Sequence, residues 1–521
     1  MIFRSRFPDV EIPEVGLAEF VIEKAETYGD RPALIDGPTG RTVTYAGLAR
    51  TVRALAAGLA QRGFGKGDVL AVYSPNLPEY AAVLHAVAML GGVTTTVNPL
   101  YTARELAEQV SDAGARLLIT VPPLLERALE ASRQAGVKDV VVFGEAKEAS
   151  SFASLLQSGE RVPPVSIAPR TDVVVMPYSS GTTGLPKGVM QTHYNLVANI
   201  CQTEALFPME VERVIAVLPF YHIYGLTVLL NISLHRGDTV VTMPRFDLEQ
   251  FLQLMQQHGV TRAYLVPPIV LALAKHPLVE KYNLGSLRSI NSGAAPLGAN
   301  IEQACENRLH CFVAQGYGLT ETSPVVSTTP IDPAVHRAGS AGLLIPNTEC
   351  RVVDPASSAE LEANQQGEVC VRGPQVMKGY LNQPAATAAM LEPDGWLHTG
   401  DIGMVDQDGY LFIVDRLKEL IKYKAFQVAP AELESLLLKH PAVADAAVIP
   451  HPDPEAGEVP KAFVVMKGQA SPEELMAFVN GQVAPFKKIR LLEVVDQIPK
   501  SPAGKILRRT LIERERSHAG A

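Results

Sequence analysis

The segment from Tyr178 to Val189, YSSGTTGLPKGV, decides which fold and which chemistry we expect of this chain. Glycine leaves backbone N–H groups free to turn toward an anion, and hydroxyl and lysine side chains add donors. The apolar run from Asp172 to Pro177 predicts a buried strand before the segment, and the spacing from His193 to Ala205 predicts a helix after it. A strand, a glycine-rich turn and a helix are the usual setting for phosphate binding. The residues of the turn that offer donors or backbone freedom are Ser180, Gly181, Thr182, Thr183, Gly184 and Lys187.

The segment is not a P-loop, because that pattern requires lysine and then Ser or Thr directly after its second glycine. Here Leu185 and Pro186 separate Gly184 from Lys187. A flexible turn without function is the alternative interpretation when the segment is taken alone.

Composition indicates a protein with more than one domain and no nucleic-acid surface. The 521 residues are 47% hydrophobic, carry a net charge of −9 and have a sequence pI of about 5.8. Five scattered cysteines without metal-ligand spacing are typical of reduced thiols in a cytosolic protein. The N-terminus has no apolar signal core, the C-terminus lacks an SKL address, and His85 and two glycines interrupt the apolar stretch from Tyr80 to Val97. We therefore expect a cytoplasmic protein without a membrane span or a nucleic-acid partner.

Strand and helix patterns alternate over residues 16–145 and again from Asp172, which predicts parallel sheets covered by helices on both faces. The expected elements include an amphipathic helix at 45–62, a strand at 93–97 and an apolar helix at 225–234. A linker rich in Ser and Pro separates the two series. From Gly339 short β-like runs predict a small antiparallel barrel or sheet, and beyond Arg416 short amphipathic pieces predict a further domain. The expected division is an N-terminal domain 1–416, with subdomains 1–171, 172–338 and 339–416, and a C-terminal α+β domain 417–521.

The signature segment resembles that of the adenylate-forming superfamily, which comprises acyl- and aryl-CoA synthetases, luciferases and peptide-synthetase adenylation domains. Three further segments match in the family's order: HTGD (His398 to Asp401), DRLKELIK (Asp415 to Lys422) and PKSPAGKILRR (Pro499 to Arg509). The chain is most similar to aryl-CoA ligases of the 4-coumarate:CoA ligase type. The resemblance implies an α/β fold with two similar βαβ subdomains, a small β-barrel and a mobile C-terminal α+β domain that closes over AMP.

The resemblance also implies where ATP is held. Ser179 to Lys187 are expected to bind its pyrophosphate end, and Asp401 and Arg416 its ribose. A carboxylate that accepts two ribose hydroxyls suits this role, and the carboxylate of Glu321 is a suitable ligand for Mg²⁺. The residues implied at the adenine and the α-phosphate are Gly293, Ala294, Ala295, Gln315, Gly316, Tyr317, Gly318 and Thr320.

Lys505, in the loop SPAGK, matches the family lysine that bridges the acyl carboxylate and the α-phosphate during adenylation. A lysine suits this role as a point charge with rotatable donors. Lys418 matches the hinge about which the C-terminal domain swings, so that one site serves two half-reactions. The catalytic residues that the resemblance implies are Lys505, Lys422, Gln427, His222, Thr183 and Glu321.

Two positions depart from the family pattern. Plant hydroxycinnamate ligases usually carry lysine, which can reach a para hydroxyl, where this chain has Asn291. The family usually has glycine where this chain has Ala425, and a side chain there would crowd the approach of the CoA thiol. The tunnel for CoA is implied at Lys424, Ala425 and Phe426. The acyl group is expected to contact His222, Tyr224, Asn291, Ala294, Gly316, Pro324 and Val325.

The sequence thus predicts an aryl-CoA ligase that uses ATP, Mg²⁺ and CoA. Cinnamate, benzoate and anthranilate types of acid are equally consistent with Asn291. A ligase for medium-chain fatty acids, acting on CoA or on an acyl-carrier protein, is the enzymatic alternative, and a binding protein that has lost activity is the non-enzymatic one. A luciferase is weakly supported, because nothing in the sequence points to oxidation. A homodimer is left open.

Overall fold

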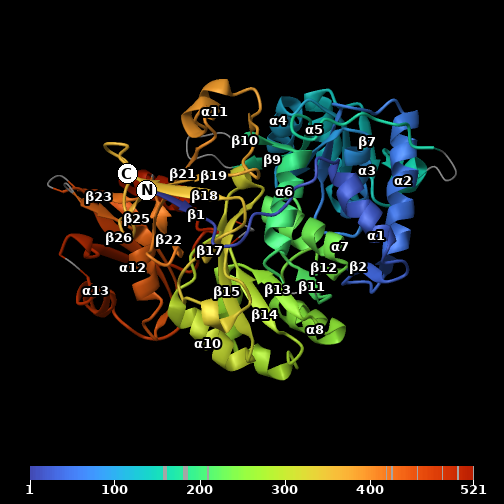
Figure 1. Ribbon diagram of the computed structural model, residues 1–521. Coiled ribbons are helices and arrows are strands. Elements are labelled where there is room, and N and C mark those ends of the chain that lie inside the picture. The colour runs from blue at the N-terminus through green and yellow to red at the C-terminus, as the bar shows by residue number, and fades with distance from the viewer. Residues whose placement is uncertain are drawn as a thin grey trace.

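The computed structural model describes residues 1–156, 161–179, 186–207, 210–417, 419–423, 426–453, 456–483, 485–501 and 504–519. Helix-covered sheets form one part of the molecule, and the C-terminal domain, in orange and red, lies beside them with both chain termini nearby (Figure 1). All five cysteines are free, as the sequence predicts. Within the described ranges, no helix combines the length and the apolar character that a membrane span requires.

The first sheet, as far as the structure describes it, has eight strands: β20 (Gly379–Tyr380), β10 (Lys187–Thr192), β9 (Val173–Ser179), β5 (Val93–Val97), β4 (Val69–Tyr73), β6 (Ala115–Thr120), β7 (Asp139–Val142) and β8 (Ser150–Ser151). The strands from β9 to β8 run parallel, as the strand–helix alternation predicts. Its helices are α2 (Tyr45–Gln61), α3 (Glu79–Met89), α4 (Ala103–Asp112) and α5 (Leu125–Ala135).

Successive residues of β4 show that both faces of this sheet are covered. Leu70 and Val72 pack into the core that contains α2 and α3, whereas Ala71 and Tyr73 pack into a separate core with α4 and α5. Side chains alternate between the two faces of a strand, so a strand buried on both sides reads as a continuous apolar run.

The second sheet, in the described part of the chain, has nine strands: β17 (Leu343–Leu344), β16 (Val325–Thr328), β15 (Phe312–Gly318), β14 (Ser289–Ser292), β13 (Arg262–Leu265), β11 (Arg213–Ala216), β12 (Thr239–Thr242), β2 (Pro32–Asp36) and β3 (Thr42–Thr44). The strands from β15 to β2 run parallel. The helices in this part are η1 (Glu19–Glu23), α1 (Lys24–Glu26), α6 (His193–Glu204), α8 (Leu248–His258), α9 (Pro267–Lys275), η5 (Pro277–Lys281) and α10 (Ala299–Leu309).

The sheets do not follow the contiguous subdomain ranges that we expected from the sequence. Strands β9 and β10, which follow residue 171, belong to the first sheet, and β2 and β3, near the N-terminus, belong to the second. Strand β2 pairs in parallel with β12, more than two hundred residues later. Hydrophobic periodicity reports only local structure, so it predicts these strands without showing which sheet they join.

The signature segment also differs from the expected strand, turn and helix. Strand β10 begins at Lys187 and runs antiparallel to β9, with Lys187 opposite Ser179. Helix α6 begins only at His193, and Thr192 and Asn195 form a capping box that satisfies its first N–H groups. Lys187 therefore stands on a strand, and the N-terminus of α6 is capped by the protein itself.

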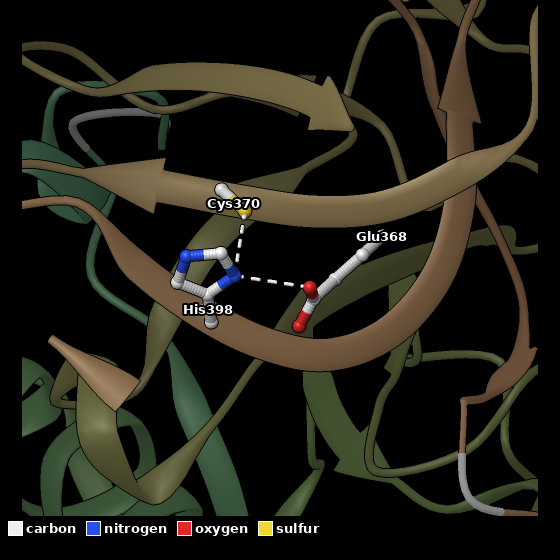
Figure 2. A group of neighbouring side chains, drawn as sticks. All are labelled: Glu368, Cys370 and His398. Carbon is white, nitrogen blue, oxygen red and sulfur yellow. Dashed lines mark hydrogen bonds and ion pairs between the residues drawn. The ribbon is translucent and has the colours of Figure 1, made fainter. Parts of the chain in front are cut away.

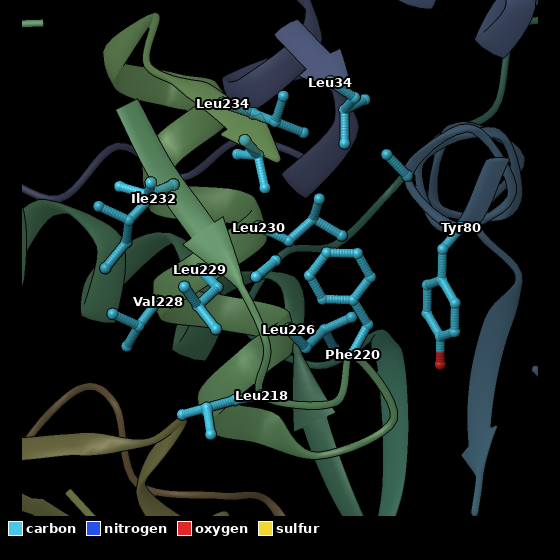
Figure 3. Packing of buried hydrophobic residues seen from close by; sticks show 14 of the residues in the cluster. Leu34, Tyr80, Leu218, Phe220, Leu226, Val228, Leu229, Leu230, Ile232 and Leu234 are labelled. Carbon is cyan, nitrogen blue, oxygen red and sulfur yellow. The ribbon is translucent and has the colours of Figure 1, made fainter. Parts of the chain in front are cut away.

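The two large sheets share a core around a wide π-helical segment, η4 (Tyr224–Ile232), which continues into α7 (Ser233–Arg236). We expected a single helix at 225–234. The leucines of η4 pack with Phe220, with Tyr80 from α3 and with Leu34 from β2 (Figure 3). This packing holds Tyr224, at the start of η4, close to the ends of the strands of the second sheet. Wide π-helical turns of this kind are frequent at functional sites.

A third, antiparallel sheet has the order β1 (Ile2–Arg4), β18 (Glu349–Val353), β19 (Gly367–Arg372), β21 (Leu397–Val405) and β22 (Leu411–Arg416). These strands form the small antiparallel sheet that the short β-like runs predict, and its outer strands β1 and β22 do not pair with each other in the described residues. The N-terminal strand β1 joins this sheet by pairing with β18, which no local pattern predicts.

The C-terminal domain contains a sheet of β24 (Phe426–Val428), β23 (Ile421–Tyr423), β26 (Gly457–Met466), β25 (Val443–Asp453) and β27 (Leu491–Val494). Its helices are α12 (Pro430–Leu437), α13 (Pro472–Asn480) and α14 (Arg508–Ala519). The remaining short helices are η2 (Pro122–Leu124), η3 (Phe152–Leu155), η6 (Thr320–Thr322), η7 (Pro333–Val335), α11 (Pro384–Met390) and η8 (Pro485–Lys487).

Candidate active site

Asp401, Arg416 and Tyr317 come from three separate motifs and form one buried polar group. Asp401 on β21 lies directly opposite Arg416 on β22. The Tyr317 hydroxyl donates to Asp401 Oδ2 at 2.7 Å, and Arg416 Nε lies 3.3 Å from Oδ1. Burial raises the pKa of the Asp401 carboxyl, and the charge of Arg416 opposes this shift. The group offers an anionic acceptor with a cation beside it, as binding of two ribose hydroxyls requires.

Glu321, on η6, is joined to the signature segment through Tyr380. Its Oε1 accepts hydrogen bonds from Ser179 Oγ at 3.0 Å and from the Tyr380 hydroxyl at 2.9 Å. Lys187 Nζ lies 5.0 Å from the centre of the Tyr380 ring. No described residue donates to Oε2 of this buried carboxylate, so one oxygen is left for a hard cation. Carboxylate oxygen and water are the ligands that Mg²⁺ prefers, and Glu321 therefore fits the role expected of it.

The loop after β14 is held in a conformation that other residues must support. Ala294 has a φ of +69°, a left-handed backbone that costs a non-glycine residue about 1 kcal/mol or more and clusters at functional sites. Gln315 braces this loop: its amide accepts from Leu297 N at 2.9 Å and donates to Leu297 O at 3.0 Å and to Glu302 Oε2 at 2.9 Å. The Gln315 amide is thus engaged within the protein. Ser292 Oγ, which is buried, has no partner in the described part and is available to a ligand.

Two of the glycines expected at the adenine are required by close contacts. A methyl group at Gly293 would lie 2.9 Å from the Tyr224 ring, and one at Gly318 would lie 2.0 Å from Pro324 O. Ala295 follows Ala294 in the same loop, and Thr320 begins η6, where its carbonyl accepts from Gln191 Nε2 at 2.5 Å.

Lys505 reaches this site from the C-terminal domain. A methyl group on the preceding residue, Gly504, would lie 3.0 Å from Val266 Cγ2, so Gly504 packs against the residue that directly follows β13. Burial lowers the pKa of Lys505 to about 8, with further contributions from the charges of Arg416, which lowers it, and of Asp401, which raises it. Lys505 is therefore close enough to Asp401 and Arg416 for their charges to act on it, although it belongs to the other domain.

His222 also lies within range of the charge of Lys505. Burial lowers the pKa of His222 to about 4, and the charge of Lys505 contributes in the same direction. His222 Nδ1 accepts from the Tyr224 backbone N–H at 3.3 Å, which leaves the proton of the neutral ring on Nε2. A neutral imidazole that donates from Nε2 beside a lysine can bind a carboxylate oxygen.

The remaining acyl-contact residues lie around β14 and β16. Asn291 Nδ2 donates to Thr328 Oγ1 at 3.0 Å, and its backbone carbonyl accepts from the Tyr224 hydroxyl at 3.1 Å. A methyl group at Gly316 would lie 3.4 Å from Asn291 Oδ1. Val325, preceded by the cis peptide between Ser323 and Pro324, is held at both backbone groups by Asn199 of α6.

Lys422 is exposed on β23, and its Cα pairs with that of Gln427 on β24. Several expected site residues lie outside the described residues: Ser180, Gly181, Thr182, Thr183, Gly184, Lys418, Lys424 and Ala425. Phe426 is placed on β24 by its backbone.

The structure adds Tyr380, Thr328, Asn199 and Glu302 to the site, none of which the sequence analysis identified. Asn199 could have been found, because a polar side chain within a buried helix usually binds a specific partner. Tyr380 lies in MKGYLN, 193 residues after Lys187, and no local pattern marks it.

Two family models match the chain: AMP-binding enzyme over residues 21–381, and AMP-binding enzyme C-terminal domain over residues 432–505. The chain therefore belongs to the AMP-binding enzyme family. Among curated proteins it is 44% identical over 523 residues to 4-coumarate–CoA ligase 5 of Oryza sativa subsp. japonica, covering 98% of this chain and 96% of the relative. It is 43% identical to 4-coumarate–CoA ligase 1 of Petroselinum crispum, with the same coverage. Within the family it groups with AMP-forming acid–thiol ligases.

Solved structures agree with this fold. ATP-bound MatB of Rhodopseudomonas palustris superposes with a TM-score of 0.87 at 29% identity, covering 96% of this chain and 99% of that one. O-succinylbenzoate CoA synthetase of Bacillus subtilis, in complex with its acyl-adenylate, gives a TM-score of 0.83 at 29% identity, with 96% and 98% covered. The anthranilate CoA ligase AuaEII, at 24% identity and a TM-score of 0.88, covers 98% of this chain and 99% of that one and supports the fold alone.

Proposed function

We propose that this protein is an ATP-dependent aryl-CoA ligase. It converts an aromatic carboxylic acid into an acyl-adenylate with release of pyrophosphate, and it then transfers the acyl group to the thiol of CoA. The observation that carries the proposal is the position of Lys505: the preceding Gly504 packs against Val266, and Lys505 lies within range of the charges of Asp401 and Arg416 and acts on His222. These are the groups that the first half-reaction needs around an α-phosphate and a carboxylate.

The residues divide the work of adenylation by their charge. Asp401, with Arg416 and Tyr317, orients the ribose, and Lys505 supplies positive charge where the carboxylate oxygen attacks the α-phosphorus. Neutral His222 donates a hydrogen bond to the acyl carboxylate without adding charge. Mg²⁺, held by Glu321, would neutralise charge on the phosphates when bound.

The residues around Asn291 bear on the choice of acid. The Asn291 amide is already bonded to Thr328, and the neighbouring Val325 and Gly316 offer no charge. These residues provide no charged group that would bind a para hydroxyl on an aromatic ring. We therefore propose an acid of the cinnamate, benzoate or anthranilate type.

A pyrophosphate-release assay with cinnamate, 4-coumarate, benzoate, anthranilate and octanoate tests this proposal. We expect kcat/KM for the best aromatic acid to exceed that for octanoate by about tenfold or more, the scale on which an apolar pocket discriminates. If octanoate is the best substrate, the protein is a fatty acyl ligase. If no acid releases pyrophosphate, the protein binds ligands without activating them.

Lys505 makes adenylation sensitive to pH. The charged form of Lys505 is needed, and burial lowers its pKa to about 8 from the ordinary value of about 10.4. We therefore expect kcat/KM for ATP to fall as the pH rises through about 8. Lys505→Arg, whose guanidinium stays protonated, should remove this fall of kcat/KM at high pH, even if the variant is slower overall. A flat profile up to about pH 9.5 would show that Lys505 acts in another protonation state.

Ala425 concerns the second half-reaction, in which the C-terminal domain, residues 417–521, is proposed to turn about Lys418 and present Lys422 and Gln427. Ala425→Gly is expected to leave adenylation unchanged and to keep or modestly raise the rate of thioester formation. Ala425→Leu should nearly abolish thioester formation while acyl-AMP accumulates, because added volume at a close approach blocks the thiol. Single-turnover measurements of acyl-AMP and acyl-CoA separate the two steps. Slower adenylation with intact acyl transfer in Ala425→Leu would show that residue 425 does not line the route of the CoA thiol.

A further inference from the structure

Glu368, Cys370 and His398 form a cluster on the third sheet that the proposed reaction does not use. Glu368 and Cys370 lie two residues apart on β19, so their side chains point to one face. His398 lies on β21 directly opposite Cys370. The register of the two strands thus brings a carboxylate, a thiol and an imidazole together, as Figure 2 shows.

The separations within this cluster are those of ligands around one metal ion. His398 Nδ1 lies 3.4 Å from Cys370 Sγ and 3.0 Å from Glu368 Oε2, and the three ligand atoms all lie within 4.8 Å of one another. In a tetrahedral zinc site with Zn–S of about 2.3 Å and Zn–N of about 2.0 Å, the sulfur and nitrogen atoms are about 3.5 Å apart. The sulfur and the imidazole nitrogen therefore already have the separation that an ion requires, and the Glu368 oxygen lies within 4.8 Å of both.

A fourth residue orients the imidazole as metal sites require. His398 Nδ1 lies 3.0 Å from Glu368 Oε2 and Nε2 lies 2.8 Å from Glu392 Oε1, so without an ion each nitrogen can donate to a carboxylate. When an ion replaces the Nδ1 proton, Nε2 keeps its hydrogen bond to Glu392 and the lone pair of Nδ1 faces the ion. A histidine ligand whose other nitrogen donates to a carboxylate is the usual arrangement around zinc. The cluster has this second carboxylate in place before any ion is bound.

We propose that Glu368, Cys370 and His398 bind Zn²⁺, with Glu392 as the positioning residue and one coordination position left open. Sulfur and nitrogen ligands favour Zn²⁺ over Mg²⁺, so the magnesium used for ATP does not compete at this cluster. Binding replaces the thiol proton of Cys370, which leaves as H⁺, by a Zn–S bond. Cys370 is fully buried, whereas the His398 side chain is 29% exposed, so the ion enters from the histidine side.

Zn²⁺ binds the thiolate form of cysteine and the neutral form of histidine, so it displaces protons from Cys370 and His398 when it binds. Its affinity therefore rises with pH.

The cluster is connected to the nucleotide site through Gly400. Glu368 Oε1 accepts the Gly400 N–H at 3.1 Å, next to Asp401. A Glu368 carboxylate drawn onto an ion gives up part of this contact, so we expect Zn²⁺ to weaken nucleotide binding. Because linkage is reciprocal, AMP must weaken Zn²⁺ binding by the same factor.

The single tryptophan of the chain makes the binding measurable. Trp396 packs against Cys370, so its emission should change as Zn²⁺ is added to untagged protein, and a chelator should reverse the change. Co²⁺ in place of Zn²⁺ should give a thiolate-to-metal absorption band. Mg²⁺ at the same concentration should change neither signal.

Variants separate this site from other binding. Cys370→Ser and His398→Gln should each abolish the Co²⁺ band, and Glu392→Gln should weaken Zn²⁺ about tenfold or more. Cys350→Ser is the matched control, because Cys350 is equally buried on the neighbouring β18 and lies outside the cluster. Because His398 is partly exposed, His398→Gln tests the site even if the buried substitution Cys370→Ser prevents folding. A Co²⁺ thiolate band that persists in Cys370→Ser or in His398→Gln, or its absence from the native protein, would overturn the site.

The coupling is tested with AMP alone, without Mg²⁺. Saturating Zn²⁺ should raise the Kd of AMP about fivefold or more in the native protein and leave it unchanged in His398→Gln. An AMP affinity that Zn²⁺ does not change would overturn the coupling through Gly400, whatever the catalytic activity of the protein.

Discussion

Lys505→Ala is expected to reduce the rate of acyl-adenylate formation by about 10²-fold or more, the scale for losing one strong electrostatic contact to a transition state. Lys505 is the cation that the C-terminal domain brings to the Asp401–Arg416 group and His222. Formation of the thioester from pre-made acyl-AMP should suffer much less, because the α-phosphorus is not attacked in that step. Quench-flow measurements of acyl-AMP and of acyl-CoA give the two rates separately.

Lys500→Ala provides the control in the same segment. Lys500 Nζ forms an ion pair with Asp445 Oδ2 at 2.7 Å within the C-terminal domain, so it carries the same charge without reaching the site. We expect Lys500→Ala to keep adenylation within a few-fold of the native rate. If Lys505→Ala slows adenylation and thioester formation equally, the proposal that Lys505 acts mainly in adenylation is wrong.

Asp401→Ala is expected to weaken ATP and AMP together by about 3 kcal/mol, roughly 10²-fold in Kd. Asp401 is 4% exposed, and its removal takes the acceptor from the ribose and also leaves Arg416 without its partner. Hydrogen bonds to a charged acceptor contribute about 1.5–3 kcal/mol each, so loss of the ribose contacts accounts for most of the effect, because Arg416 is 34% exposed and stays hydrated. Calorimetric titration of AMP onto each variant measures the effect directly.

Asp408→Asn is the matched control, because Asp408 is 58% exposed in the turn between β21 and β22 and pairs with Arg337 outside the site. Its AMP affinity should equal that of the native protein. The native protein should also discriminate against 2′-deoxy-ATP, which lacks one of the two hydroxyls. Equal use of ATP and 2′-deoxy-ATP would show that Asp401 does not bind the ribose.

Much of the fold could be predicted because it depends on local patterns. Helix α2 was expected at 45–62 and runs over Tyr45–Gln61, and β5 was expected where it occurs, at Val93–Val97. Both lie in segments whose apolar residues follow one period throughout, so neighbouring residues alone determine the element. The motif residues Asp401 and Arg416 could likewise be named from the sequence, because each lies in a short, ordered signature.

What the sequence by itself determined is therefore the class of fold, most helices and strands, and the residue types that carry the chemistry. Only the tertiary structure decided that β2 joins a sheet with β12, that β10 returns antiparallel to β9, and that Tyr380 links Lys187 to Glu321. It also decided that Cys370 faces His398 across two strands, although the spacing of the cysteines indicated no metal site. The physical reason is that strand register and domain contact join residues far apart in the chain, and their energies depend on partners that no local pattern contains.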